Sequence, residues 1–164
     1  MENNSLTSIQ YKNVYLRSYT FPFRQFNAVV EDFHNKVKAA GIEMDGMFFY
    51  SLDAINRKSD EDADMTVTMY QPAKSYKKVD ENELGFLDAM VYSGMSYKVL
   101  EGDFETQTER AYYELITEAK EKGMGIKGSF FHEFRVQTDS EGKKRAICIV
   151  KARMEPNSKE KKNG

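Results

Sequence analysis

The side chains best suited to bind a ligand or to take part in a reaction are a carboxylate and the aromatic residues around it. Glu133 lies in the run Phe130-Phe131-His132-Glu133-Phe134. A carboxylate in aromatic surroundings is costly to desolvate, so it attracts a cation or takes up a proton. Aromatic walls suit flat apolar ligands and bind cations through their ring faces. The run predicts a small-molecule site with Glu133 as its acidic anchor, and an ion pair to Arg135 or Arg145 is the alternative interpretation.

The remaining reactive residue types do not form a catalytic or metal-binding pattern. Cys148 is the single cysteine and has apolar neighbours, which predicts a buried thiol and excludes an intrachain disulfide. His34 and His132 are far apart and lack the spacing of metal ligands. We predict that His132 is a buried, hydrogen-bonded histidine and not a haem ligand. The sequence has no P-loop and no nucleophile elbow, so no cofactor, metal or catalytic residue is expected.

Composition excludes several further classes of protein. The chain has 164 residues, 40% of them hydrophobic, and a formal net charge of −2. This suits one domain of ordinary size and disfavours duplex nucleic acid as a partner. The start of the sequence lacks the features of a signal peptide, and no apolar run approaches the ~20 residues of a membrane span. A cytoplasmic protein without a membrane or nucleic-acid partner is expected.

An internal repeat organises the elements that must position Glu133. Gly41 and Gly46 are each followed, 82 positions later, by another glycine, and Phe48-Phe49 is followed at the same offset by Phe130-Phe131. Matches at half the chain length indicate a duplicated unit. Tyr15 and Tyr97 stand at the same offset.

Each half contains the same predicted order of elements, which is strand, helix, strand, strand. Patterns of β-branched and aromatic residues predict the strands, and apolar spacings of three and four predict the helices. Gly41 is expected to end the first helix, and Asp139-Ser140-Glu141-Gly142 is expected to form the turn between the last two strands. The ranges are 9–19, a helix from after 22 to 40, 47–52 and 65–70 in the first half, and 89–100, 105–122, 130–136 and 145–152 in the second.

This order predicts an α+β fold. Two such units give an antiparallel-type sheet with both helices on one face and a groove on the other. A single domain at 1–156 is expected, with repeat 1 about 9–72, a linker at 73–88 and repeat 2 about 89–154. The charged residues 157–164 are interpreted as a solvated tail.

Alternation along the strand after the second helix decides which side chains reach the groove. Phe130, His132 and Phe134 are expected to pack on the helices, and Phe131 and Glu133 to face the groove. Ordinary core packing is the alternative for each apolar member of the predicted site. The predicted ligand-binding residues are Glu133, Phe131, Phe49, Tyr15, Tyr97, Met65 and Val67.

The repeated unit resembles the GyrI-like small-molecule-binding family, which includes effector-binding domains of AraC- and MerR-type regulators and is related to SOUL proteins. The residues that carry the resemblance are Gly102-Asp103-Phe104, Gly123 and the run from Gly128 to Phe134. The resemblance places Glu133 on the family's acidic pocket residue, which favours cationic aromatic compounds. Asp103 replaces the usual proline and His132 precedes the glutamate, and the sequence contains no helix-turn-helix domain.

The resemblance implies a stand-alone cytoplasmic protein that binds hydrophobic or cationic small molecules. The alternative is a protein–protein interaction module that uses the groove or a sheet edge. A third hypothesis follows from family members that are hydrolases, with Glu133 as general base beside Tyr97 or Tyr15.

Overall fold

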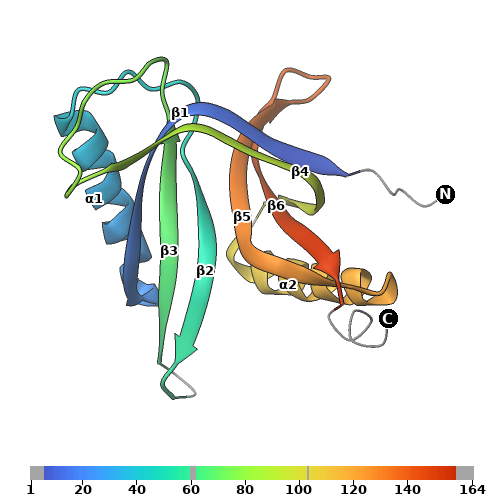
Figure 1. The fold of residues 1–164 in the computed structure, drawn as a ribbon. Helices are drawn as coiled ribbons and strands as arrows, with labels where there is room; N and C mark the ends of the chain where they lie inside the picture. The colour runs from blue at the N-terminus through green and yellow to red at the C-terminus, as the bar shows by residue number, and fades with distance from the viewer. Residues whose placement is uncertain (1–5, 60–61, 103, 158–164) are drawn as a thin grey trace. The chain divides into compact units, whose positions relative to one another are not determined.

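The computed structural model describes residues 6–59, 62–102 and 104–157, and in this part the chain forms six strands and two α-helices. The predicted α+β class with antiparallel strands is confirmed. Asp103 of the sequence motif and all of the predicted tail except Asn157 lie outside the described residues. The elements are β1 Thr7–Pro22, the 3-10 turn η1 Phe23–Gln25, α1 Phe26–Ala39, β2 Phe49–Arg57, β3 Ala63–Pro72, β4 Gly85–Glu101, α2 Phe104–Glu121, β5 Met124–Thr138 and β6 Lys144–Pro156 (Figure 1).

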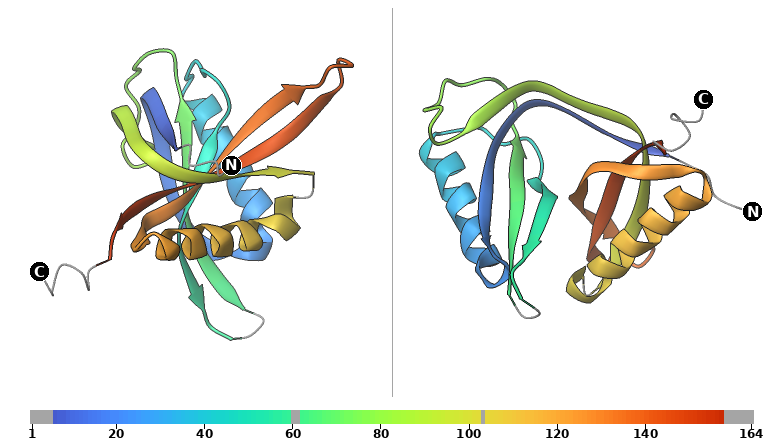
Figure 2. Two further views of the ribbon diagram at one scale, coloured as in Figure 1. Left: turned by 90° about the vertical axis from the view of Figure 1, so that its right-hand side faces the viewer. Right: turned by 60° about the horizontal axis from the view of Figure 1, so that its bottom comes forward.

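The chain divides into two compact units. The N-terminal unit is Gln10–Val91, and the C-terminal unit is Met1–Ile9 together with Tyr92–Gly164. Each contains strand, helix, strand and strand in the order that the predicted repeat requires. Each helix lies along strands of its own unit (Figure 2).

The N-terminal unit is a three-stranded antiparallel sheet with β3 in the middle, paired to β1 and β2. Pro22 ends β1 because its ring fixes φ and removes a donor. The predicted apolar stripe of α1 is confirmed, since Phe33 and Val37 are fully buried. Gly41 follows the helix at φ +69°, a left-handed conformation in which glycine carries no Cβ strain.

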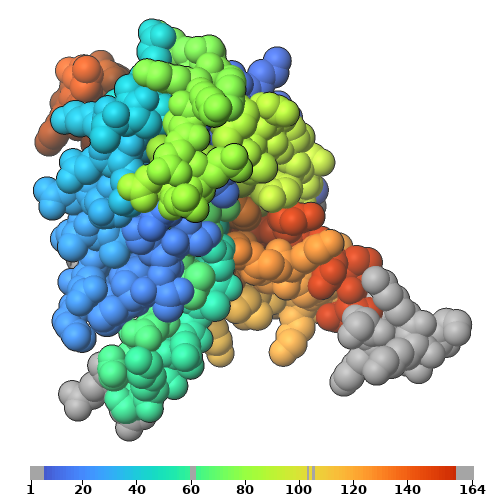
Figure 3. All heavy atoms as spheres, turned by 60° about the vertical axis from the view of Figure 1, so that its left-hand side comes forward, coloured from blue at the N-terminus to red at the C-terminus, as the bar shows by residue number. Residues whose placement is uncertain are grey.

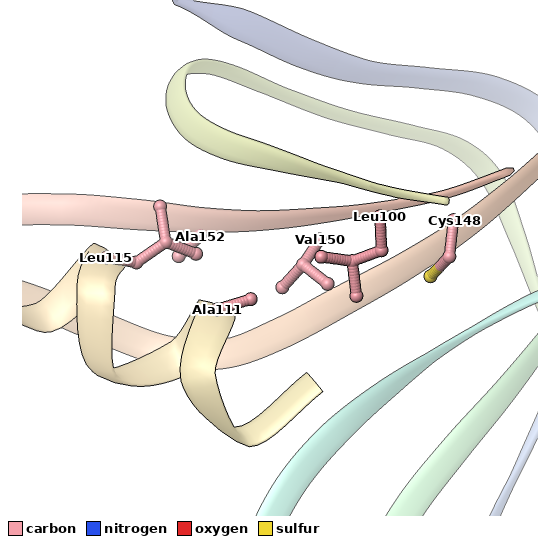
Figure 4. Packing of buried hydrophobic residues seen from close by; sticks show 6 residues of the cluster. All are labelled: Leu100, Ala111, Leu115, Cys148, Val150 and Ala152. Atoms are coloured by element: carbon pink, nitrogen blue, oxygen red, sulfur yellow. The ribbon is translucent and has the colours of Figure 1, made fainter. Parts of the chain in front are cut away.

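The C-terminal unit repeats this arrangement with β6 in the middle, paired to β4 and β5. Its core forms where α2 packs on the sheet, and Ala111 and Leu115 supply the helix side of that contact. The short Ala111 side chain lets the helix approach the strands closely. The buried cluster consists of Leu100, Ala111, Leu115, Cys148, Val150 and Ala152 (Figure 4).

The predicted linker is shorter and more firmly held than its polar composition suggests. β4 begins at Gly85, four residues before the predicted start at 89. The Tyr15 hydroxyl donates to the carbonyl of Lys77 and accepts from its N–H, both at 2.6 Å. The Arg17 guanidinium donates to the carbonyls of Asn82 and Glu83 at 2.9 and 2.8 Å. Segment 74–84 is therefore bound to β1 through side-chain contacts that local sequence patterns do not reveal.

The predicted turn between the last two strands is confirmed. The Asp139 carboxylate accepts the N–H groups of Glu141 and Lys143, each at 2.9 Å, and Gly142 has φ +83°. None of the helices in the described ranges is long and apolar enough to cross a membrane.

Candidate functional site

The two faces of β5 carry different chemistry, as its alternation predicts. Phe130 stacks on Tyr112 of α2 at a ring separation of 4.2 Å, and the Tyr112 hydroxyl bonds to Nε2 of His132 at 2.6 Å. Phe134 also packs against the core beneath α2. Because successive side chains of a strand point to opposite faces, Phe131 and Glu133 lie on the side away from α2.

Glu133 is buried with only 1% of its surface exposed, and basic side chains hold its carboxylate. The ammonium of Lys151 on β6 pairs with Oε1, and Arg135 lies 3.4 Å from Oε2. Lys151 also donates to the carbonyl of Ser8 at 2.6 Å. Of the two arginines named by the ion-pair interpretation, Arg135 contacts Glu133, and Arg145 pairs with Glu101.

Aromatic and basic residues surround this ion pair on the same face. The rings of Tyr92 and Phe131 are 5.5 Å apart, and the guanidinium of Arg153 lies 4.4 Å from the Tyr92 ring centre. Tyr97 on β4 stands directly opposite Lys151. Phe131 is buried, whereas Tyr92, Tyr97 and Arg153 are half-buried. We call this set the aromatic–basic face, and it consists of Tyr92, Tyr97, Phe131, Glu133, Lys151 and Arg153.

Three members of this face, Tyr92, Lys151 and Arg153, are not among the site residues predicted from the sequence. A signal for Lys151 and Arg153 was present, because they continue the alternation of Ile147 and Ile149 along β6. Both faces of that strand are apolar enough to leave its orientation undecided from the pattern alone. The ladder with β5 resolves it, since Phe131 pairs with Lys151.

In the N-terminal unit, Phe49 belongs to a ring stack on the face away from α1. It lies between Tyr11 and Tyr70, with ring centres 4.7 Å away on both sides. Beside the stack, the hydroxyls of Ser51 and Thr68 donate to the Asp53 carboxylate at 2.7 and 2.6 Å. Ser51 occupies the repeat position of Glu133. The acidic residue of the N-terminal unit, Asp53, therefore lies two residues further along β2, at a bulge.

Three of the predicted site residues, Tyr15, Met65 and Val67, lie on the other side of their sheet. They share the face of Tyr19, whose hydroxyl donates to Asp32 of α1 at 2.9 Å. Their prediction as groove residues is corrected, because a fixed offset of 82 does not hold on these strands.

The pairings show the shift by one residue. Tyr15 stands opposite Gln71, whereas Tyr97 stands opposite Lys151. On β1 the position that is equivalent to Tyr97 in strand pairing is Leu16, one residue after Tyr15. Leu16 stands opposite Tyr70. A shift of one residue moves a side chain to the other face of a sheet.

His132 and Cys148 form a buried contact beneath α2. Nδ1 of His132 lies 3.9 Å from Sγ of Cys148. Burial lowers the pKa of His132 to about 3. Burial, together with the negative charge of Glu133, raises the pKa of Cys148 to about 12. At neutral pH the imidazole is therefore uncharged and the thiol is protonated. The prediction of a buried, hydrogen-bonded histidine at position 132 is confirmed.

A surface pocket of about 490 Å³ lies in the N-terminal unit, between α1 and segment 78–84 (Figure 3). Lys36 and Glu83 form an ion pair of 3.3 Å in its lining. None of the predicted site residues lines it. Across the described ranges, no three His, Cys, Asp or Glu side chains are close enough together to hold a metal ion.

Two solved structures share the fold of this chain at low sequence identity. The crystal structure of the EcmrR C-terminal domain is 14% identical, with a TM-score of 0.67, over 93% of this chain and 97% of that one. EcmrR in its complex with DNA, solved by cryo-electron microscopy, is 15% identical with the same TM-score; the chain spans 57% of it. These likenesses support the predicted GyrI-like fold.

The chain belongs to the family described as a domain of unknown function, DUF5085, which matches residues 10–154. The match covers both units of the described structure. No curated protein matches the chain.

Proposed function

We propose that this protein binds a small hydrophobic molecule on the aromatic–basic face of its C-terminal unit. Two findings support the proposal. The fold is that of the C-terminal domain of EcmrR, which has also been solved in a complex with DNA, and the family that the sequence resembles includes effector-binding domains of MerR-type regulators. In addition, Glu133 and Lys151 bury opposite charges beside aromatic rings.

The buried ion pair is the observation that carries the proposal. Replacing a buried ion pair by apolar side chains is often neutral or stabilising. A contribution to stability alone therefore does not explain why this protein has such a pair. Buried charges beside half-buried aromatic rings are typical of sites that bind ligands. Phe131 and Tyr97 supply the apolar surface, and Glu133 with Lys151 supplies the polar anchor.

The expected preference for hydrophobic ligands follows from the half-buried rings, while a preference for cations meets an obstacle. A cation that binds Glu133 must take the place of the Lys151 ammonium. Removing one partner of a buried pair costs about 3 to 5 kcal/mol. The ligand must therefore contribute mainly apolar contact. Phe49 and its ring stack form a second proposed aromatic surface, in the N-terminal unit.

A thermal-shift screen of aromatic compounds that are cationic, anionic and neutral tests this function. A ligand at a hundred times its dissociation constant stabilises the fold by about 2.7 kcal/mol, which corresponds to about 5 to 10 °C for a chain of this size. Tyr97→Ala should reduce the shift, since it removes a half-buried ring from the face.

The matched control is Tyr113→Ala, which deletes a ring that is 74% exposed on α2. It should leave the shift unchanged. The proposal fails if no compound of any charge raises the melting temperature, or if both variants respond like the wild type.

A further inference from the structure

We propose that the ligand of the aromatic–basic face is an organic anion, such as an aromatic carboxylate or sulfonate. This inference rests on the proposed function and specifies its ligand class. It reverses the charge that the sequence led us to expect.

Arg153 is the first reason. Its guanidinium lies over the ring of Tyr92, and none of the carboxylates in the described ranges comes within 4.0 Å of it. The side chain is half-buried, so the cation is only partly solvated. A guanidinium that stacks on a ring keeps its N–H edge available for a carboxylate, with which it forms two parallel hydrogen bonds.

The balance of charge on this face is the second reason. Lys151 and Arg153 are alternate residues of β6, so their side chains are neighbours on the same face, about 7 Å apart along the strand. Glu133 already holds Lys151 and contacts Arg135. One buried acid thus serves two basic side chains, and Arg153 adds a third positive charge, while the acid Glu155, two residues further along β6, is exposed to solvent. An incoming anion meets an excess of positive charge, and an incoming cation meets repulsion.

The aromatic residues complete a site for an amphipathic anion. The Tyr92 ring contacts Phe131, and Tyr97 is opposite Lys151. An aromatic ligand can stack on the half-buried tyrosines and direct its acidic group to Arg153. Apolar contact then supplies affinity, while the guanidinium selects the sign of the charge.

Naphthalene-2-sulfonate and 2-naphthyltrimethylammonium test the inference, because they share one aromatic ring system and carry opposite charges, and the sulfonate offers acceptor oxygens to Arg153. Isothermal titration at fixed ionic strength should show the sulfonate binding at least about tenfold more tightly than the ammonium compound to the wild-type chain. Arg153→Gln should reduce this ratio about tenfold. Arg153→Lys, which keeps the charge and loses the planar fork, should retain most of it.

Arg110→Gln is the matched control. It makes the same change in net charge at a side chain that is 82% exposed on α2, so the ratio should stay at the wild-type value. Circular dichroism and the melting temperature verify that each variant is folded.

Each outcome decides a different point. Tighter binding of the ammonium compound, or a ratio that Arg153→Gln leaves unchanged, overturns the anion inference while small-molecule binding stands. Binding of neither probe overturns the inference, and together with a negative thermal-shift screen it overturns the proposed function as well.

Discussion

At the scale of single residues, burial determines the chemistry of this protein more than residue type does. His132 is the clearest case. The sequence predicts a buried histidine because the strand alternation turns it toward the helix, and the structure confirms its bond to Tyr112. Its depressed pKa then has a consequence for stability.

The protein should lose stability as the pH falls, in part because of His132. The folded pKa lies below the ordinary value of 6.5, so the unfolded chain binds the extra proton between about pH 6.5 and pH 3. Stability therefore rises with pH in this window. Between pH 7 and pH 5 the wild type should lose about 2 kcal/mol more than His132→Gln, as measured by urea unfolding.

His34→Gln is the control for this measurement. Burial also lowers the pKa of His34, but this side chain is only half-buried on α1. The variant should keep most of the wild-type loss. Equal pH dependence in the wild type and His132→Gln would show that His132 does not titrate on unfolding.

At the scale of elements, the ladder between β5 and β6 places an acid and a base together inside the C-terminal unit. Lys151 stands opposite Phe131, two residues from Glu133 along β5, and the two charges meet diagonally. Sequence alternation identified the face of Glu133. The partner could not be named, because it depends on the register of a strand that follows after a turn.

Glu133→Gln should lower the free energy of unfolding by about 3 to 5 kcal/mol, because it leaves the Lys151 ammonium buried without its carboxylate. The double variant Glu133→Gln/Lys151→Met should recover most of this loss, since it removes both charges. Urea unfolding of the wild type, the two single variants and the double variant gives the coupling energy.

The partly exposed ion pair of Lys98 and Glu118 gives the comparison. Their side chains are 27% and 47% exposed, so Glu118→Gln should change stability by less than about 1 kcal/mol. Additive effects at Glu133 and Lys151 would contradict the view that the two residues stabilise each other.

At the scale of the whole molecule, the connection between the two halves is part of the fold. Segment 74–84 lies within the stretch 73–88 that was predicted to be a linker because of its polar composition. Tyr15 and Arg17 hold it from β1, through contacts that span more than sixty residues of sequence. Such contacts have no local signature.

Tyr15→Phe should loosen this segment, because it removes both hydrogen bonds to the backbone of Lys77. Losing bonds to a buried hydroxyl costs about 1 to 3 kcal/mol, so trypsin should cleave after Lys77 or Lys78 about 5- to 160-fold faster. Tyr113→Phe, at an exposed site, should leave the rate unchanged. Cleavage of Tyr15→Phe at the wild-type rate would show that other contacts hold the segment.

The sequence by itself determined the order of elements, the faces of β5 and α1, and the turns at Gly41 and Gly142. Those features depend on local periodicity and on backbone conformations that only certain residues adopt. The order of elements that the repeat predicted is found in the structure. It could be predicted because the spacing of similar residues along the chain can be read from the sequence.

Tertiary structure alone decided the partners of each strand face. A shift of one residue between the pairings of Tyr15 and Tyr97 turned Tyr15, Met65 and Val67 toward α1. Strand register also brought Lys151 to Glu133 and Arg153 to Tyr92. The physical reason is that the side-chain period of a strand is two, so a single-residue change in long-range pairing reverses which side chains meet.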